Sequence, residues 1–165
     1  MSLPSYIKDT GDFLTKIYDV AWDEGILLIT IDVTALYTFI EHEDGLRAVK
    51  HFLNTRALGL YKYTEMLLIM IQNCLQDYCF LFNNCLYQQM RGTAMGTCYV
   101  PSYANLHMGW WEEQVLLGEE LIEWSNRIIM WVCYTDYIFA IWKGDEETAT
   151  EFVKKINTNT SNHKP

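Results

Sequence analysis

The sequence predicts an α+β domain in which a largely antiparallel sheet is flanked by helices. Segments with apolar residues at helical spacing alternate with short apolar runs of strand length. Two pairs of these runs are joined by short polar turns, which predict hairpins and hence antiparallel neighbours. Half of the 165 residues are hydrophobic and 15% are aromatic. This composition is typical of a chain that buries a packed core rather than of a disordered one.

The first elements that we expect are a helix and a strand. Asp9 and Asp12 are typical of a helix start, because their carboxylates accept hydrogen bonds from free backbone N–H groups and face the positive end of the helix dipole. We therefore predict a helix over residues 11–18. Asp23-Glu24-Gly25 predicts a turn. The apolar, β-branched run 26–33 that follows predicts a buried strand ending in an acid.

The middle of the chain predicts two helices and a hairpin. Apolar residues recur at helical spacing over 43–54. The more apolar segment 64–76 predicts a second helix, buried on most sides. Two aromatic and apolar runs, 78–82 and 85–90, flank Asn83-Asn84. Because asparagine tolerates positive φ, this pair predicts a tight hairpin turn.

The last third predicts a helix, a second hairpin and a final helix. Proline suits the first turn of a helix, so we expect one over Pro101–Glu113. The apolar runs 128–134 and 138–142 flank Thr135-Asp136-Tyr137, which predicts a hairpin with an acid at its tip. Gly144-Asp145 and the acids after it start a helix that we expect to end at about Ile156.

The domain organisation that we expect is simple. The length is that of one domain, which we place over residues 1–157, followed by a short polar segment, 158–165, predicted to be a disordered tail. The longest apolar stretches, 25–31 and 66–71, are too short to span a bilayer, so we expect no membrane association. No targeting segment is visible, which favours the cell interior.

The net charge of −9 argues against a stand-alone nucleic-acid binder. Neutralisation of phosphates by basic side chains supplies most of the non-specific affinity for nucleic acid, and such proteins are therefore normally basic. The charge is compatible with a catalytic core that holds metal ions through acids and whose basic parts lie elsewhere.

The cysteines and histidines do not predict a site. The five cysteines are odd in number and include no C-x-x-C pair, so a zinc site is disfavoured and buried free thiols in a reducing compartment are the favoured interpretation. The four histidines are scattered, with no signature of a Ser/Cys–His hydrolase, and surface or core roles suffice for them. These residues are Cys74, Cys79, Cys85, Cys98, Cys133, His42, His51, His107 and His163.

Two acids stand out by their position. Asp32 ends a predicted strand, and Asp136 lies in the tight turn between two others. Carboxylates brought together from neighbouring strands can bind divalent metal ions, as two-metal phosphoryl and nucleotidyl transfer requires. The alternative is that both acids cap turns and stay solvated.

Three ordered segments resemble the catalytic motifs of reverse transcriptases, in the form found in Penelope-like retroelements. Residues 28–38 (LITIDVTALYT) resemble the first motif, and 134–142 (YTDYIFAIW) resemble the third. The second motif, the most specific of the three, is matched by 89–97 (QMRGTAMGT) running on to 101–106 (PSYANL). Residues 4–10 (PSYIKDT) resemble the stretch that precedes the first motif, so the similarity extends from about residue 4 to about 157.

The resemblance implies a polymerase palm-type antiparallel sheet with flanking helices and an RNA-directed DNA polymerase activity that uses two metal ions, Mg²⁺ or Mn²⁺. It implies that Asp32, Asp136 and the backbone at Val33 bind the metal. Its implied partners are an RNA template, a DNA primer and deoxynucleotides, and its implied place of work is the nucleus, although no basic cluster suggests an import signal.

The same resemblance implies a nucleotide- and template-binding set. Tyr37 matches the aromatic residue that lies under the sugar of the incoming nucleotide and favours deoxynucleotides, with a core aromatic as the alternative. Gly92 and Gly96 would let the backbone approach the template base and the nucleotide. Side chains that would line the same pocket are Gln89, Arg91 and Met95.

The pattern breaks at Tyr137, which stands where the third motif has its second aspartate. A neutral phenol is a poor ligand for a hard cation, so we expect polymerase activity to be strongly impaired or lost. Further departures are Thr34 for lysine, Glu41 for proline, Cys98 for proline and Cys133 for a basic residue. The matched segment has no counterpart of basic fingers, thumb or endonuclease, so we expect a partial, degenerate palm.

A second hypothesis is a non-enzymatic, palm-derived binding module or a pseudogene-like product. The six tryptophans and eleven tyrosines could provide an exposed aromatic surface for a protein partner. Trp110-Trp111 and Trp142 are candidates, with a core role as the alternative for each. Divalent-metal binding that depends on Asp32 and Asp136 would discriminate the two hypotheses.

Overall fold

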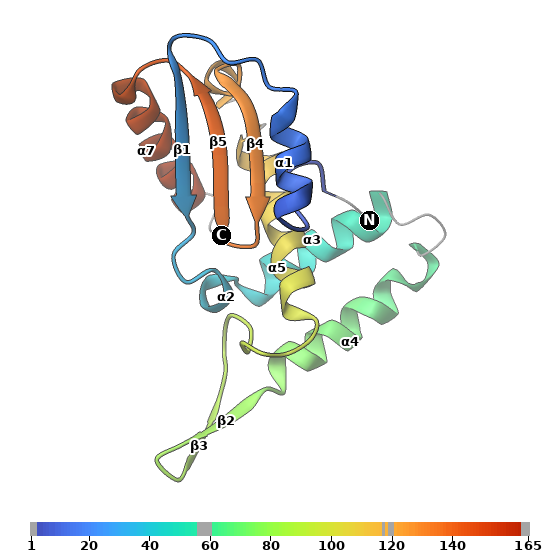
Figure 1. Cartoon of the computed structure of the whole chain (residues 1–165). Helices are drawn as coiled ribbons and strands as arrows, with labels where there is room; N and C mark the ends of the chain where they lie inside the picture. Colours follow the sequence, from blue (N-terminus) through green and yellow to red (C-terminus); the bar gives the residue numbers. More distant parts are fainter. Residues whose placement is uncertain (1–2, 56–60, 117, 119–120, 163–165) are drawn as a thin grey trace. The chain divides into compact units, whose positions relative to one another are not determined.

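The computed structural model describes residues 3–55, 61–116, 118 and 121–162 (Figure 1). The chain divides into two compact units. The helical unit comprises residues 1–3 and 34–110, and the sheet unit comprises residues 4–33 and 111–165. Each unit is described by itself.

The sheet unit contains an antiparallel sheet of three strands in the order β1-β5-β4, which confirms the predicted fold class (Figure 1). The strands are β1 (Ile26–Asp32), β4 (Ile128–Tyr134) and β5 (Tyr137–Lys143). The hairpin between β4 and β5 turns on Thr135 and Asp136 alone, with Thr135 at φ 59°. The turn is one residue shorter than we predict from the sequence, and Tyr137 begins β5 directly opposite Asp32.

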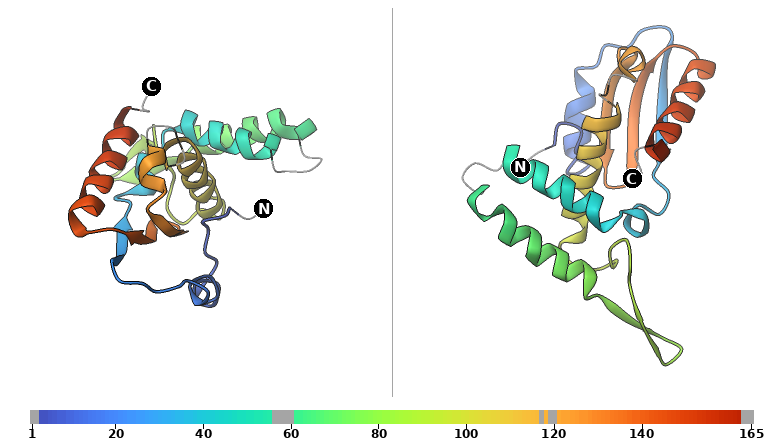
Figure 2. Two further views of the ribbon diagram at one scale, coloured as in Figure 1. Left: turned by 90° about the horizontal axis from the view of Figure 1, so that it is seen from above. Right: turned by 180° about the vertical axis from the view of Figure 1, so that it is seen from behind.

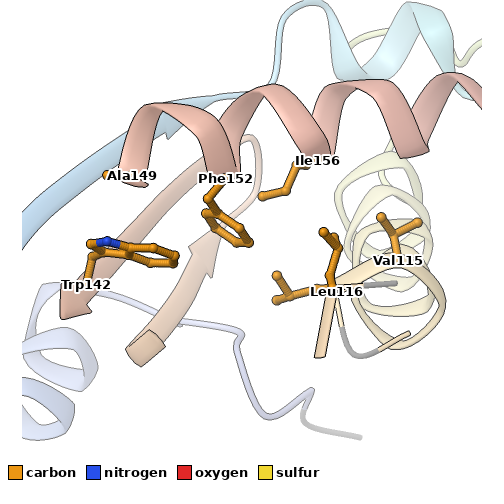
Figure 3. Close-up of a cluster of buried hydrophobic side chains, with 7 residues drawn as sticks. Val115, Leu116, Trp142, Ala149, Phe152 and Ile156 are labelled. Atoms are coloured by element: carbon orange, nitrogen blue, oxygen red, sulfur yellow. The ribbon is translucent and has the colours of Figure 1, made fainter. Parts of the chain in front are cut away.

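One face of this sheet packs against α7 (Glu146–Asn162) and the π-helical turn Glu112–Leu116. The view from behind the sheet in Figure 2 shows α7 running along it. Figure 3 shows Phe152 of α7 lying against Trp142 of β5, with a ring-centroid separation of 4.8 Å. Trp142 is fully buried, so this surface candidate is a core residue. The remaining buried members of the cluster are Val115, Leu116, Leu121, Ala149 and Ile156.

Two helices of the sheet unit differ from expectation. Helix α7 continues to Asn162, beyond the end expected near Ile156 and into the segment expected to be a disordered tail. The rest of that segment, 163–165, lies outside the described residues. The short helix α6 (Ile122–Ser125) precedes β4 and was not expected from the sequence.

Strand β1 is an edge strand and not the buried strand that its apolar run predicts. Leu28, Thr30 and Asp32 alternate along one face and are exposed, and Leu28 is 57% exposed. Helix α1 (Thr10–Tyr18) covers part of the same face, since Phe13 packs edge-on against Phe139 at 5.1 Å. Its predicted start is confirmed, because the Asp12 N–H donates to the Asp9 carboxylate at 2.9 Å.

A buried carboxylate joins the N-terminal segment to β4. Ser5 and Ile7 hydrogen bond to the backbone of Cys133, extending the sheet by one parallel bridge. Glu112 accepts a hydrogen bond from the Ser5 hydroxyl and another from the Trp131 indole N–H at 2.8 Å. Burial raises the pKa of the Glu112 carboxyl, although both hydrogen bonds oppose this shift.

The helical unit contains the helix pair α3 (His42–Thr55) and α4 (Thr64–Gln76) and the helix α5 (Val100–Trp111). Helix α3 packs against α4, and Gly45 of α3 lies so close to the Tyr103 ring of α5 that a methyl group at this position would overlap it. The bounds are α2 (Leu36–Phe39), α3 (His42–Thr55), the 3₁₀ turn Tyr61–Tyr63, α4 (Thr64–Gln76) and α5 (Val100–Trp111), of which the last residue belongs to the sheet unit.

Helix α4 is more exposed than we predict, and the hairpin after it is exposed as well. Only Thr64 and Leu75 of α4 are buried, whereas Met66, Ile69 and Met70 are each more than half exposed. The hairpin of β2 (Cys79–Phe82) and β3 (Cys85–Gln88) is exposed at every residue. Its predicted turn is confirmed, with Asn83 at φ 50° and Asn84 at φ 60°.

The expectation of buried thiols holds for one cysteine and is wrong for the others. Cys133 is buried, and burial, reinforced by the negative charges of Glu112 and Asp136, raises the pKa of its thiol to about 12. The exposed thiols lie on α4, on the hairpin and just before α5: Cys74, Cys79, Cys85 and Cys98. Among the described residues, no helix combines the length and the apolar character needed to cross a membrane.

Candidate functional site

The end of the sheet at the β4–β5 turn carries a row of three exposed side chains, one from each strand. Asp32 of β1 is paired in register with Tyr137 of β5, which is paired with Tyr134 of β4. Directly opposed residues of antiparallel strands project from the same face, with Cβ atoms about 5 Å apart. Tyr137 is 60% exposed and Tyr134 is 52% exposed. The row is therefore an acid followed by two phenol rings.

The second acid lies in the turn beside this row. The Val33 N–H, just beyond β1, donates to the Asp136 carbonyl oxygen at 2.9 Å. This hydrogen bond fixes the end of β1 against the β4–β5 turn, so Asp32 and Asp136 lie at the same end of the sheet. Asp136 and Val33 are half-buried, whereas Asp32 is exposed.

The oxygen donors at this end are of the chemical type that a hard cation would take. Mg²⁺ is commonly held by one or two carboxylates, with water and substrate phosphates completing the octahedron. Asp32 and Asp136 would supply two carboxylates to such an ion, and the backbone carbonyl of Val33 would supply a third oxygen. Within the described ranges, no group of three or more His, Cys, Asp and Glu side chains is placed to hold a metal ion. Tyr137 occupies the register position at which a further carboxylate would complete such a group.

The other predicted site residues belong to the helical unit, where Tyr37 and Gly92 are in close contact. The Thr93 N–H donates to the Tyr37 carbonyl at 2.7 Å, and the Gly92 N–H donates to the Ile40 carbonyl at 2.9 Å. Gly92 is buried with φ +71°, and a Cβ there would lie 2.6 Å from Thr38 Cα and from the Tyr37 carbonyl oxygen. Only glycine fits this position without displacing backbone.

The remaining residues of the predicted nucleotide set are placed on either side of this contact. The Gln89 amide donates to the Arg91 carbonyl at 3.0 Å, which holds the start of the loop. Met95 is 75% exposed, and the space around Gly96 is open although its φ is +98°. The predicted metal-binding residues and the predicted nucleotide-binding residues thus belong to different units.

Three residues near Gly92 had no predicted role. The His42 imidazole Nε2 lies 2.9 Å from the Gly92 carbonyl oxygen, so the loop is held from both its N–H and its carbonyl side. The Arg91 guanidinium lies 5.0 Å from the centre of the Phe39 ring and 3.8 Å from the Glu41 carboxylate. Sequence spacing gave no signal for these contacts, because about fifty residues separate their members along the chain. Glu41, noted as a departure from proline, is an exposed ion-pair partner of Arg91.

Comparison of sequences identifies no relative. No family model matches the chain, and no curated protein matches it in sequence. The three motif-like segments therefore remain the indication of function in the sequence.

Comparison of structures shows a likeness of fold alone, to two solved telomerase structures. The fold is similar to telomerase from Candida tropicalis, with a TM-score of 0.65 and 13% identity over 94% of this chain. It is also similar to telomerase from Candida albicans in complex with a TWJ fragment of telomeric RNA, with a TM-score of 0.64 and 10% identity over 91% of this chain. The chain spans 32% and 28% of the lengths of these two structures.

Proposed function

We propose that the chain is a reverse-transcriptase palm of the Penelope-like type whose nucleotidyl transfer is strongly impaired or lost. The fold class, the order of the three motifs and the meeting of Asp32 and Asp136 at one end of the sheet support this proposal. The ancestral reaction would join deoxynucleotides to a DNA primer on an RNA template, with the nucleus as its place of work.

The observation that carries the impairment is the register of Tyr137 opposite Asp32. Bound Mg²⁺ or Mn²⁺ would supply charge stabilisation for the transferred phosphate, an effect worth several kcal/mol. Asp32, Asp136 and the Val33 carbonyl would hold it. Tyr137 adds a ring where a further carboxylate would lie, so the site has less negative charge to offset the cations. Loss of a few kcal/mol of this stabilisation lowers the rate by at least about a hundredfold.

The helical unit would supply the nucleotide pocket. Tyr37 would face the sugar, and the backbone at Gly92, with Gln89 and Arg91 beside it, would face the base pair being formed. Met95 and Gly96 are exposed and free to meet template or nucleotide. The hydrogen bonds that hold residue 92 to Tyr37–His42 would keep these groups in one arrangement before substrate binds.

Primer extension on an RNA template tests the proposal. The assay compares this chain with Tyr137→Asp and with the double variant Tyr137→Asp/Asp32→Ala, in magnesium and then in manganese. We expect extension by Tyr137→Asp at least about a hundredfold above the unsubstituted chain, and loss of extension in the double variant.

Tyr134→Asp is the matched control, because Tyr134 is exposed in the same row and the substitution adds the same charge one strand away. It should not activate extension. Equal extension by the unsubstituted chain and Tyr137→Asp would refute the impairment. Failure of every variant would refute polymerase competence of this chain.

A second candidate function is a non-enzymatic binding module derived from a palm. The β2–β3 hairpin favours it, because Phe80, Leu81, Phe82, Leu86 and Tyr87 are 45–73% exposed and the hairpin carries no charged residue. Contiguous apolar surface of this kind is typical of partner sites. Divalent-metal binding that Asp32→Ala and Asp136→Ala abolish would favour the polymerase lineage of the site over this alternative.

A further inference from the structure

The two units differ sharply in charge. The helical unit has five acidic and five basic residues, whereas the sheet unit has sixteen acidic and seven basic residues. The entire net charge of −9 is therefore in the sheet unit. A field of this sign repels phosphate backbones and attracts cationic partners.

Within the sheet unit, the open row at the β4–β5 turn combines acids with exposed rings. Asp32, Tyr137 and Tyr134 lie side by side on one face, with Asp136 in the adjacent turn. In the next row, Phe139 is covered by Phe13 of α1, so the covering helix leaves the Asp32 row open. The row therefore has two exposed tyrosines next to an exposed carboxylate, and aromatic rings with a carboxylate are the chemistry that binds a guanidinium or ammonium group.

Lys143, the one basic residue on strands β1, β4 and β5, and Arg127 just before β4 lie at the end of the sheet opposite the row. Lys143 is paired with Ile26 at the start of β1, and the Lys143 N–H donates to the carbonyl of Arg127 at 2.8 Å. Lys16 of α1 lies nearer the row, because its ammonium donates at 2.6 Å to the carbonyl of Tyr6, which is bridged to Cys133, and this cation is engaged there. The open row is therefore an acidic and aromatic surface whose own strands place their cations away from it.

We propose that this surface, formed by Asp32, Tyr137 and Tyr134 with Asp136 beside them, binds an arginine-containing basic segment of a protein partner. The guanidinium stacks on the Tyr137 and Tyr134 rings and pairs with Asp32. Tyrosine is among the residues that most often dominate binding energy at interfaces, because it buries a large rigid surface. The replacement that weakens metal binding thus creates the second ring of the pair. This inference goes beyond the proposed polymerase lineage and does not require any residual catalysis.

The test measures binding of a fluorescein-labelled peptide of alternating arginine and glycine to the full chain by fluorescence anisotropy. The comparison variants are Asp32→Asn, Tyr137→Leu and Tyr137→Phe. We expect Asp32→Asn and Tyr137→Leu each to weaken binding about threefold, since exposed ion pairs and cation–π contacts are worth up to about 1 kcal/mol. Tyr137→Phe keeps the ring and should bind like the unsubstituted chain. Binding should also weaken as salt is added.

The matched control is Glu151→Gln, an exposed acid on α7 of the same unit that changes the net charge by the same amount. It should leave the affinity unchanged. The inference is wrong if Glu151→Gln weakens binding as much as Asp32→Asn, if Tyr137→Leu has no effect, or if the peptide does not bind. It is also wrong if a single-stranded RNA oligonucleotide binds the same surface more tightly than the peptide. Because Asp32 and Tyr137 are exposed, unchanged circular dichroism spectra should accompany all of these variants.

Discussion

The sheet unit and the helical unit hold their predicted site residues in opposite ways. In the sheet unit, the side chains of Asp32, Tyr137 and Tyr134 project from a regular ladder into solvent, and the backbone beneath them does not depend on their identity. In the helical unit, the contact between Gly92 and Tyr37 is made by the backbone itself, is buried, and excludes even a methyl group. Function can therefore change in the first without loss of the fold, whereas change in the second disturbs the fold.

The largest expected effect is on the stability of the hydrophobic core between the sheet and α7. Phe152→Ala removes the ring that stacks on Trp142 and Trp124, and we expect it to lower the free energy of unfolding by about 4 kcal/mol. Urea denaturation followed by tryptophan fluorescence measures this loss. Met66→Ala on the exposed face of α4 is the control and should change stability by less than about 0.5 kcal/mol. Similar losses in both variants would contradict the position of the core.

The second prediction concerns the two loop glycines of the helical unit. Gly92→Ala meets both a positive φ and backbone atoms at 2.6 Å, so we expect a loss of about 3 kcal/mol. Gly96→Ala meets a positive φ in open space, and we expect a loss of about 1 kcal/mol. Thermal or urea denaturation of the two variants gives the comparison. Equal losses would show that the Gly92–Thr38 contact is looser than described.

The third prediction concerns Glu112, the buried carboxylate of the sheet unit. Burial raises its pKa in the folded state above the ordinary value of 4.5, so its stabilising contribution is complete below that pH and is lost as pH rises through the folded-state pKa. We therefore expect the stability of the unsubstituted chain, relative to Glu112→Gln, to fall as pH rises from 4 to 8. The groups that face Glu112 are Ser5, Trp131, Glu113 and Cys133. A difference that is constant or rises with pH would contradict the raised pKa.

The smallest expected effect concerns the reactivity of the thiols, which also differs between the two units. Four cysteines are exposed and lie in the helical unit, whereas Cys133 is buried in the sheet unit with its thiol pKa raised to about 12. Titration of the native chain with a colourimetric disulfide reagent should count four thiols, and unfolding in urea should release the fifth. Five rapidly reacting thiols would show that the pairing of Ser5–Ile7 with Cys133 opens readily.

Local chemistry predicted most of the elements. The Asp9 cap, the Asn83-Asn84 turn and the apolar runs of both hairpins give the elements close to their observed bounds, because each signal resides within a few residues. Burial was less predictable. The apolar runs of β1 and α4 predict buried elements, yet Leu28, Met66 and Ile69 are exposed, since burial depends on what packs against an element.

The candidate site residues were likewise predictable from local sequence only in part. Asp32 was singled out at a strand end and Asp136 in a turn, and Tyr137 was singled out by the resemblance to the third motif. What the sequence could not predict is the length of the β4–β5 turn, which decides that Tyr137 projects from the sheet face beside Asp32. The contact of His42 with Gly92 was equally hidden, because hydrogen bonds between distant segments follow from the packing of α3 and its neighbours and leave no local pattern.

The two-residue turn has a consequence for how this chain could change over generations. Aspartate and tyrosine codons differ by a single base, and position 137 is an exposed strand residue at which either side chain fits the same ladder. One point mutation therefore separates the row with tyrosine at position 137 from a row with aspartate there, and neither form has to cross an unfolded intermediate to reach the other. Exchange of tyrosine and aspartate at this position would leave the protein foldable and would need no compensating change elsewhere in the sheet.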